Sequence, residues 1–170
     1  VLAAFALCAY TAPAAQRTSR PNVLLVTLDT TRADRIGAYG YTLAETPVLD
    51  RLAREGVRFA DATSQSPLTA PAHAALLTGQ YPGRLGIRNN ASSPIPESAV
   101  TLAESLRGNG YRTGAFIGAF VVDRAYGFAQ GFDVFDAAFA SFFFSVIVHF
   151  ALIFPSELAG RRWIATSCTT

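Results

Sequence analysis

The chain has 170 residues, of which 51% are hydrophobic and 15% are charged, and its net charge is +2. This length and composition set one globular domain as the upper limit. All 14 positively charged side chains are arginines, and they are scattered rather than gathered into the basic run that a nucleic-acid backbone would require. We therefore expect no nucleic-acid partner. Cys8 and Cys168 stand near opposite ends of the chain and predict no disulfide framework.

The chain starts with an apolar run over residues 1–10, followed by small residues spaced as an export peptidase prefers. This pattern predicts a signal peptide over residues 1–15, and hence an exported protein, periplasmic or extracellular. A buried strand or short helix is the alternative for the same run.

The next segment, residues 23–28, holds five apolar residues among six and shows no alternation, which predicts a strand buried on both faces of a parallel sheet. Thr46 and Pro47 then predict the cap and the first position of a helix that Gly56 ends. Residues 57–62 are a plausible second strand.

A second helix is predicted from Thr101 and Glu104, which have the spacing of a capping box. This helix should end near Asn109-Gly110 and lead into a strand within residues 111–118. The order strand, helix, strand, helix, strand predicts an α/β fold with a mostly parallel sheet flanked by helices.

Residues 138–154 form a 17-residue stretch without formal charge, and Arg161-Arg162 follows it. This length is the lower limit for a membrane-spanning helix, and the basic pair would then favour a cytoplasmic C-terminus. A buried core segment is an equal alternative, because His149 would be costly at the middle of a bilayer. A shifted reading frame after Asp136 is the third interpretation.

Asp29 is the first candidate site residue, because it follows the first predicted strand. In open α/β sheets, ligands bind at the carboxyl ends of strands, where a carboxylate can hold a hard divalent cation. The plainer alternative is an aspartate that caps the turn after the strand.

Thr69 is the second candidate, since it precedes Pro71 by two positions and a helix-forming run follows. Free N–H groups and the helix dipole favour an anion there, which suits a nucleophilic hydroxyl, whereas the alternative is a simple helix cap. His73 lies one helical turn later near the same face. It could bind the anion or bear on the hydroxyl's proton, or be an ordinary packed or solvated histidine.

These candidates belong to a longer series of sequence blocks, at residues 21–29, 31–34, 37–41, 46–59, 69–79 with Tyr81-Pro82, 101–118 and 131–133. In order and spacing, the blocks resemble the sulfatase family of the alkaline phosphatase superfamily. The resemblance covers about residues 21–136 and implies the N-terminal portion of an alkaline-phosphatase-like domain, incomplete in this chain, with residues 137–170 as a tail of uncertain status.

The resemblance also implies roles for individual residues. Asp29 stands at the place of a metal ligand, and Thr30 stands where many members have a second aspartate. Thr69 stands where a cysteine or serine is converted to formylglycine, a conversion for which threonine is not a substrate. Thr69 therefore resembles the nucleophile and second metal ligand of phosphodiesterases and phosphonate hydrolases of the superfamily, while His73 replaces the signature arginine.

The cofactor implied by the resemblance is a divalent metal ion, either calcium or one of zinc, magnesium and manganese. The predicted function is metal-dependent hydrolysis of sulfate or phosphate esters, with a small anionic ester as substrate. The alternative is a truncated or frame-shifted, catalytically inactive fragment that acts at most as a binding or membrane-associated protein, through residues 138–154. The sequence predicts no particular oligomeric state.

Overall fold

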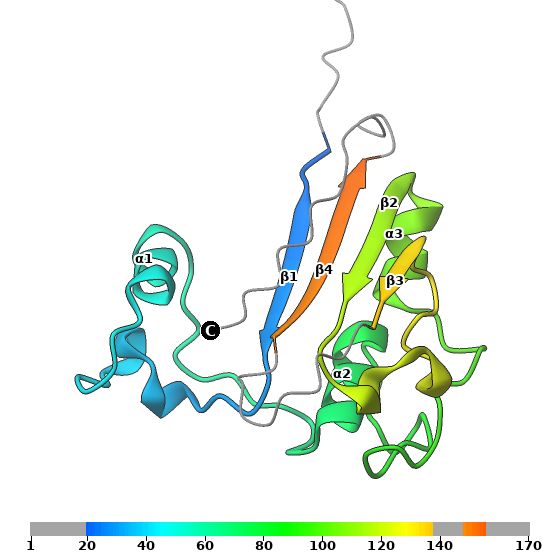
Figure 1. The fold of residues 1–170 in the computed structure, drawn as a ribbon, viewed down its shortest axis with the longest axis horizontal. Helices are drawn as coiled ribbons and strands as arrows, with labels where there is room; N and C mark the ends of the chain where they lie inside the picture. The colour runs from blue at the N-terminus through cyan, green and yellow to red at the C-terminus, as the bar shows by residue number, and fades with distance from the viewer. Residues whose placement is uncertain (1–19, 138–147, 156–170) are drawn as a thin grey trace, which may run out of the picture.

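The computed structural model describes residues 20–137 and the backbone of residues 148–155, so the predicted signal peptide and most of the apolar tail lie outside the described residues. A four-stranded sheet forms the centre of the fold, in the order β1-β4-β2-β3 (Figure 1). Its strands are β1 (Val23–Leu28), β2 (Tyr111–Phe116), β3 (Val134–Asp136) and β4 (Val148–Pro155).

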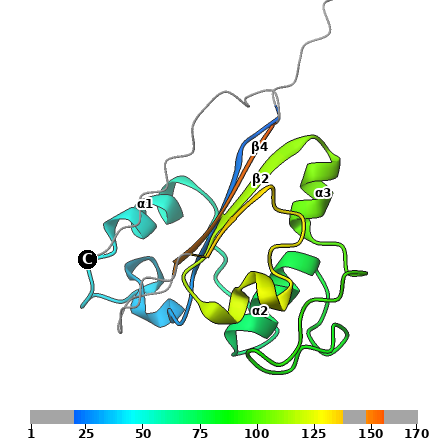
Figure 2. The same cartoon turned by 45° about the vertical axis from the view of Figure 1, so that its right-hand side comes forward.

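The helices are distributed over both sides of this sheet. Two of them, α2 and α3, lie on one side, whereas α1, η1 and η2 lie on the other (Figure 2). The α-helices are α1 (Pro47–Glu55), α2 (Thr69–Thr78) and α3 (Leu102–Gly108), and the short 3-10 helices are η1 (Ala33–Arg35), η2 (Gly37–Tyr39), η3 (Phe120–Val122) and η4 (Arg124–Tyr126).

The helices on both sides of the sheet and the shared direction of three strands confirm the predicted α/β class, although two of the three strand pairings are antiparallel. β4 pairs antiparallel with both β1 and β2, while β2 pairs parallel with β3. β1, β2 and β3 therefore share one direction, and β4 runs against them. β4 comes from the end of the apolar stretch 138–154, and residues 138–147 of that stretch lie outside the described residues. Within the described ranges, the structure contains no helix with the length and apolar character needed to span a membrane.

The predicted strand at residues 57–62 is wrong. The segment is irregular, and Val57 and Phe59 have exposed fractions of 82% and 69%. The hydroxyl of Tyr39 donates to the carbonyl of Phe59 at 3.1 Å, a tie to η2 rather than to the sheet. β4 occupies the position beside β1. Apolar and β-branched residues form a strand where a partner strand and a packing surface exist, and the described parts of the chain offer this segment neither.

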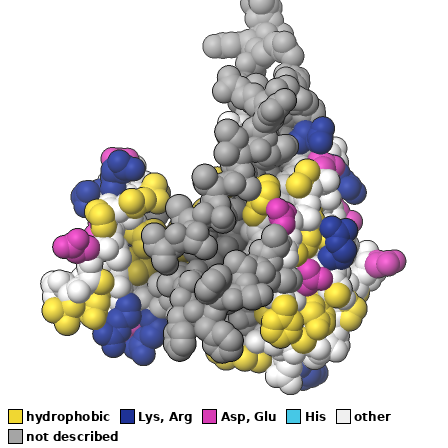
Figure 3. Space-filling view, viewed as in Figure 1, with side chains coloured by type: hydrophobic (Ala, Val, Ile, Leu, Met, Phe, Trp, Pro, Cys, Tyr) yellow, Lys and Arg dark blue, Asp and Glu magenta, His cyan; other side chains and the backbone are white. Residues whose placement is uncertain are grey.

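Helix α1 is confirmed with Thr46 at its N-cap. The Thr46 hydroxyl accepts from the backbone N–H of Gly37 and donates to Asp50, which ties the start of α1 to η2. Two apolar side chains of this helix, Val48 and Leu52, are each 59% exposed. Hydrophobic side chains accordingly appear at the surface of the part of the molecule that holds α1 (Figure 3).

The hydrophobic core lies between α2 and the segments that precede and follow β2. Small side chains on α2 allow these segments to approach the helix closely, which gives the dense packing typical of protein interiors. The buried members of this core are Ala70, Ala74, Leu85, Ile87, Ile95, Ala99, Ala119, Val121, Val122 and Phe128.

The predicted capping box of α3 is also confirmed. The Thr101 hydroxyl accepts from the Glu104 N–H at 3.1 Å, and the Glu104 carboxylate accepts from the Thr101 N–H at 2.8 Å. The same carboxylate accepts from the side-chain amide of Gln130 at 3.0 Å. These hydrogen bonds lower the pKa of the Glu104 carboxyl, with the Thr101 N–H as the largest cause.

Gly131 packs directly against this box, and its φ of +86° is in the left-handed region. A Cβ atom at this position would lie 2.4 Å from the backbone nitrogen of Glu104. We expect Gly131→Ala to lower the free energy of unfolding by the roughly 1–2 kcal/mol that left-handed backbone costs an L-residue, and further through damage to the cap. Urea denaturation measures this loss. Gly83→Ala is the control, because a Cβ there meets nothing within 4 Å; equal losses in both variants would contradict the expectation.

Candidate active site

Asp29 follows β1 directly, and its two carboxylate oxygens have different partners. Oδ1 accepts from the backbone N–H of Thr30 at 2.8 Å, and Oδ2 accepts from the hydroxyl of Thr69 at 3.0 Å. One oxygen therefore caps the turn after the strand, and the other contacts the second candidate residue. This geometry is compatible with both interpretations of Asp29, as a residue that caps the turn after the strand and as a candidate site residue.

Thr30 gives this turn its shape. Its φ of +58° is in the left-handed region, which is rare for a β-branched residue. Such a conformation costs about 1–3 kcal/mol and persists where the surrounding structure enforces it. The Thr30 N–H donates to the Asp29 carboxylate, and this hydrogen bond helps to fix the orientation of that carboxylate.

Thr69 is the first residue of α2, and the preceding Leu68 is the N-cap. The alternative in which Thr69 serves as a simple helix cap is therefore wrong, because its hydroxyl donates to Asp29 instead. The capping contact comes from Asn90, whose Oδ1 accepts from the Ala70 N–H at 2.9 Å. Pro71 has no N–H. The N–H groups expected to receive an anion are thus partly occupied or missing.

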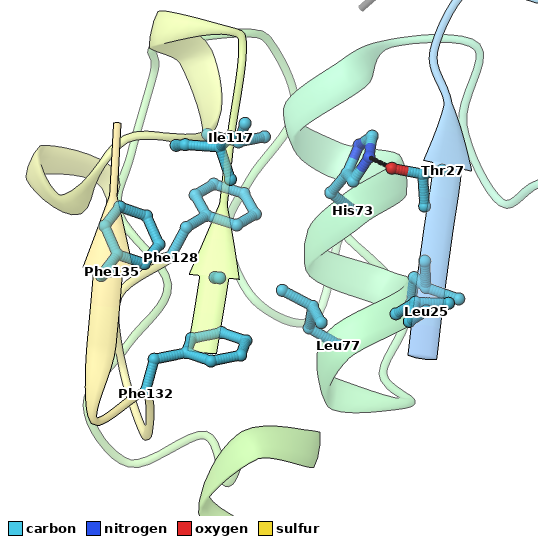
Figure 4. A pocket seen from close by; sticks show the side chains of 11 residues that line it. Leu25, Thr27, His73, Leu77, Ile117, Phe128, Phe132 and Phe135 are labelled. Atoms are coloured by element: carbon cyan, nitrogen blue, oxygen red, sulfur yellow. Dashed lines mark hydrogen bonds between the residues drawn. The ribbon is translucent and has the colours of Figure 1, made fainter. Parts of the chain in front are cut away.

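His73 bridges α2 and β1. Its Nδ1 lies 2.8 Å from the carbonyl oxygen of Thr69, and its Nε2 lies 3.0 Å from the hydroxyl of Thr27. Figure 4 shows the second of these contacts, between the ring on the helix and the hydroxyl on the strand. The structure therefore brings Asp29, Thr69 and His73 together, and the ring of His73 is hydrogen-bonded to the backbone carbonyl of Thr69.

A cleft of about 520 Å³ opens beside these residues. Its size suits a small-molecule ligand. The end of β1, the start of α2 and the loop between α1 and α2 form its walls, and most side chains from the loop are small or polar. Arg84 and Arg88, which could contact an anion, do not line it. The lining residues are 27–31, 62–69, Ala72, His73 and Leu76.

The donor set at this site fits part of a divalent cation's shell. Among the residues that the structure describes, no group of three or more His, Cys, Asp and Glu side chains could hold a metal ion. Asp29 and Thr69 nevertheless present two hard oxygen atoms 3.0 Å apart, close to the spacing of roughly 3 Å between neighbouring oxygens around octahedral magnesium. Such a cation takes about six ligands, so these two residues would be part of a larger set.

Thr27 and Asn90 were missed by the sequence analysis. Thr27 looks like an ordinary β-branched residue within a strand, and Asn90 accepts from the N–H of Ala70, which lies 20 residues earlier in the chain. Neither contact follows from a local pattern, because each depends on which segments the fold brings side by side.

Comparison with known proteins agrees with the sequence blocks. The family model for sulfatases matches residues 21–142. Steryl-sulfatase of Mus musculus is 41% identical over 127 residues, which are 69% of this chain and 20% of that protein. Arylsulfatase A of Bos taurus is 42% identical over 101 residues, covering 56% of this chain and 20% of that protein. N-acetylglucosamine-6-O-sulfatase of Bacteroides thetaiotaomicron is 33% identical over 132 residues, which are 78% of this chain and 23% of that protein.

The matched part of the chain therefore spans about a fifth of the length of these curated relatives. No solved structure matches the chain. Because the family model covers well over half of its residues, this chain belongs to the sulfatase family.

Proposed function

We propose that this chain carries the nucleophile of a metal-dependent hydrolase of sulfate or phosphate esters, and that the nucleophile is the hydroxyl of Thr69. The observation that carries the proposal is the 3.0 Å hydrogen bond from this hydroxyl to Asp29, at the edge of the cleft. Family membership and relatives named as steryl-sulfatase and arylsulfatase A support an ester of sulfuric acid as one substrate class.

A threonine hydroxyl is a weak nucleophile unless a neighbouring group activates it. The Asp29 carboxylate accepts the hydrogen bond of the hydroxyl, which leaves the lone pairs of the Thr69 oxygen available to an ester in the cleft. Attack would form a bond from this oxygen to sulfur or phosphorus and break the bond to the alcohol of the ester, while the proton of the hydroxyl passes to Asp29 Oδ2 and from there to the departing alcohol oxygen. Water would then cleave the new threonine ester and restore the hydroxyl.

Asp29 and Thr69 are the residues of this chain that would hold a divalent cation. When bound, such a cation lowers the pKa of a coordinated hydroxyl and offsets charge on the transferred group. In this proposal, His73 supports the position of Thr69 through its hydrogen bond to the Thr69 carbonyl. An exported location, predicted from residues 1–15, belongs to the same proposal.

Direct attack by a hydroxyl distinguishes this proposal from the formylglycine chemistry of the family, for which Thr69 is not a substrate. A hydroxyl nucleophile is equally suited to a phosphorus centre. We therefore include phosphate diesters beside sulfate esters, and the competing proposal is an inactive sulfatase-like fragment that hydrolyses neither.

We expect Thr69→Ala to reduce hydrolysis by at least about a thousandfold, because removal of a covalent nucleophile leaves only the remaining contributions to catalysis. The assay compares para-nitrophenyl sulfate with bis(para-nitrophenyl) phosphate, using the full chain with added magnesium, manganese, calcium or zinc and after treatment with EDTA. Thr42→Ala is the matched control, since Thr42 is an exposed threonine outside the cleft.

Equal rates of hydrolysis in wild type and Thr69→Ala would show that Thr69 is not the nucleophile. Equal rates with and without EDTA would show that hydrolysis does not depend on a divalent cation. A wild-type chain that hydrolyses neither ester with any of the four cations would favour the inactive fragment.

A further inference from the structure

Two successive side-chain hydrogen bonds connect the end of β1 with α2, and each is called a level below. Asp29 contacts Thr69, while Thr27, two residues earlier on the strand, contacts His73, four residues later on the helix. Strand residues two apart share a face and lie about 6.6 Å from each other, and helix residues four apart are separated by about 6 Å along the axis. Because the two spacings match, the second contact fixes the register in which the first can form.

His73 also connects the two levels within the helix. Its Nδ1 lies 2.8 Å from the Thr69 carbonyl oxygen, and a carbonyl oxygen can only accept, so Nδ1 carries a hydrogen. In the neutral ring, Nε2 then has a lone pair, to which the Thr27 hydroxyl donates. The hydroxyl of Thr27 thus sets the orientation of the ring, and the ring holds the backbone of Thr69.

This pair has an apolar side and a polar side. On one side, Thr27 and His73 border a small pocket of about 40 Å³ that is otherwise apolar (Figure 4); on the other, both line the cleft beside Asp29 and Thr69. On the apolar side, a polar atom that loses its partner costs about 1–3 kcal/mol. The other residues that line the small pocket are aliphatic or aromatic, among them Leu25, Leu77 and Phe128.

We propose that Thr27 is a positioning residue for the Thr69 hydroxyl, and that it acts through His73. The two neighbours of Thr69 therefore have different roles. His73 holds the backbone of Thr69, and Asp29 accepts the hydrogen bond of the Thr69 hydroxyl. The link to catalysis rests on the proposed function. The positioning of Thr69 can be measured without any substrate.

The test compares Thr27→Val, which keeps the shape of the side chain and removes its hydroxyl, with Thr27→Ser, which keeps the hydroxyl. Thr27→Ala repeats the comparison with a smaller side chain. NMR of the isotope-labelled full chain reports the nitrogen shifts of the His73 ring and the three-bond couplings of the Thr69 methyl group. The chain has two histidines, so His73→Gln identifies the ring signals.

In wild type and Thr27→Ser, we expect a protonated Nδ1, a hydrogen-bonded Nε2 and a single Thr69 rotamer. In Thr27→Val, the Nε2 signal should shift from its wild-type position, and the Thr69 couplings should average over rotamers. Thr69 couplings that stay unchanged in Thr27→Val would overturn the inference, as would a wild-type ring protonated on Nε2 alone.

Kinetics with the ester that the wild type hydrolyses give a second readout. Thr27→Val should lower kcat about tenfold or more with KM changed less than twofold, because misplacement of the attacking atom affects the chemical step. Thr27→Ser should restore kcat. An unchanged kcat in Thr27→Val would overturn the role in catalysis. A wild type without activity would overturn the proposed function, whereas the Thr69 couplings would still decide whether Thr27 positions the hydroxyl.

Discussion

The hydrogen bond between the Thr69 hydroxyl and the Asp29 carboxylate joins residues 40 positions apart, and the candidate site is arranged around it. The backbone N–H of Thr30 orients the carboxylate, and Asn90 caps the end of the helix that carries the hydroxyl. Each group holds one partner of the bond from a different part of the chain.

The magnitudes indicate what keeps this arrangement in place. A hydrogen bond to a charged group contributes about 1.5–3 kcal/mol, whereas the strain at a residue such as Thr30 costs about 1–3 kcal/mol. The two effects are similar in size, so the bond alone does not hold the site. The packing of α2 supplies the rest of the free energy that holds the site, because Ala70 and Ala74 on the same helix as Thr69 are buried in the core.

Local patterns in the sequence predicted those parts of the fold whose causes are local. The continuous apolar run gave β1 but not the predicted burial on both faces, because β1 stands at one end of the strand order and Leu24 and Val26 are 59% and 41% exposed. Thr46 with Pro47 gave the start of α1, and the capping box gave α3. Residues 57–62 have a similar composition but form no strand, because strand formation depends on a partner and β4 occupies the place beside β1. The direction of β4 likewise depends on pairing, which its own residues do not encode.

The candidate site shows the same division between local and long-range causes. Asp29 and Thr69 could be singled out because each stands at the end of an element where ligands bind. Thr27 and Asn90 could not, since their partners are set by the packing of segments distant in the sequence.

A double-mutant cycle with Asp29→Ala and Thr69→Val tests the central claim most directly. Urea unfolding of the four proteins in EDTA removes any contribution from a bound cation. The account predicts a coupling free energy between about 0.5 and 3 kcal/mol, as for residues in direct contact. Losses that add within about 0.3 kcal/mol would show that the carboxylate and the hydroxyl do not meet, and would contradict it.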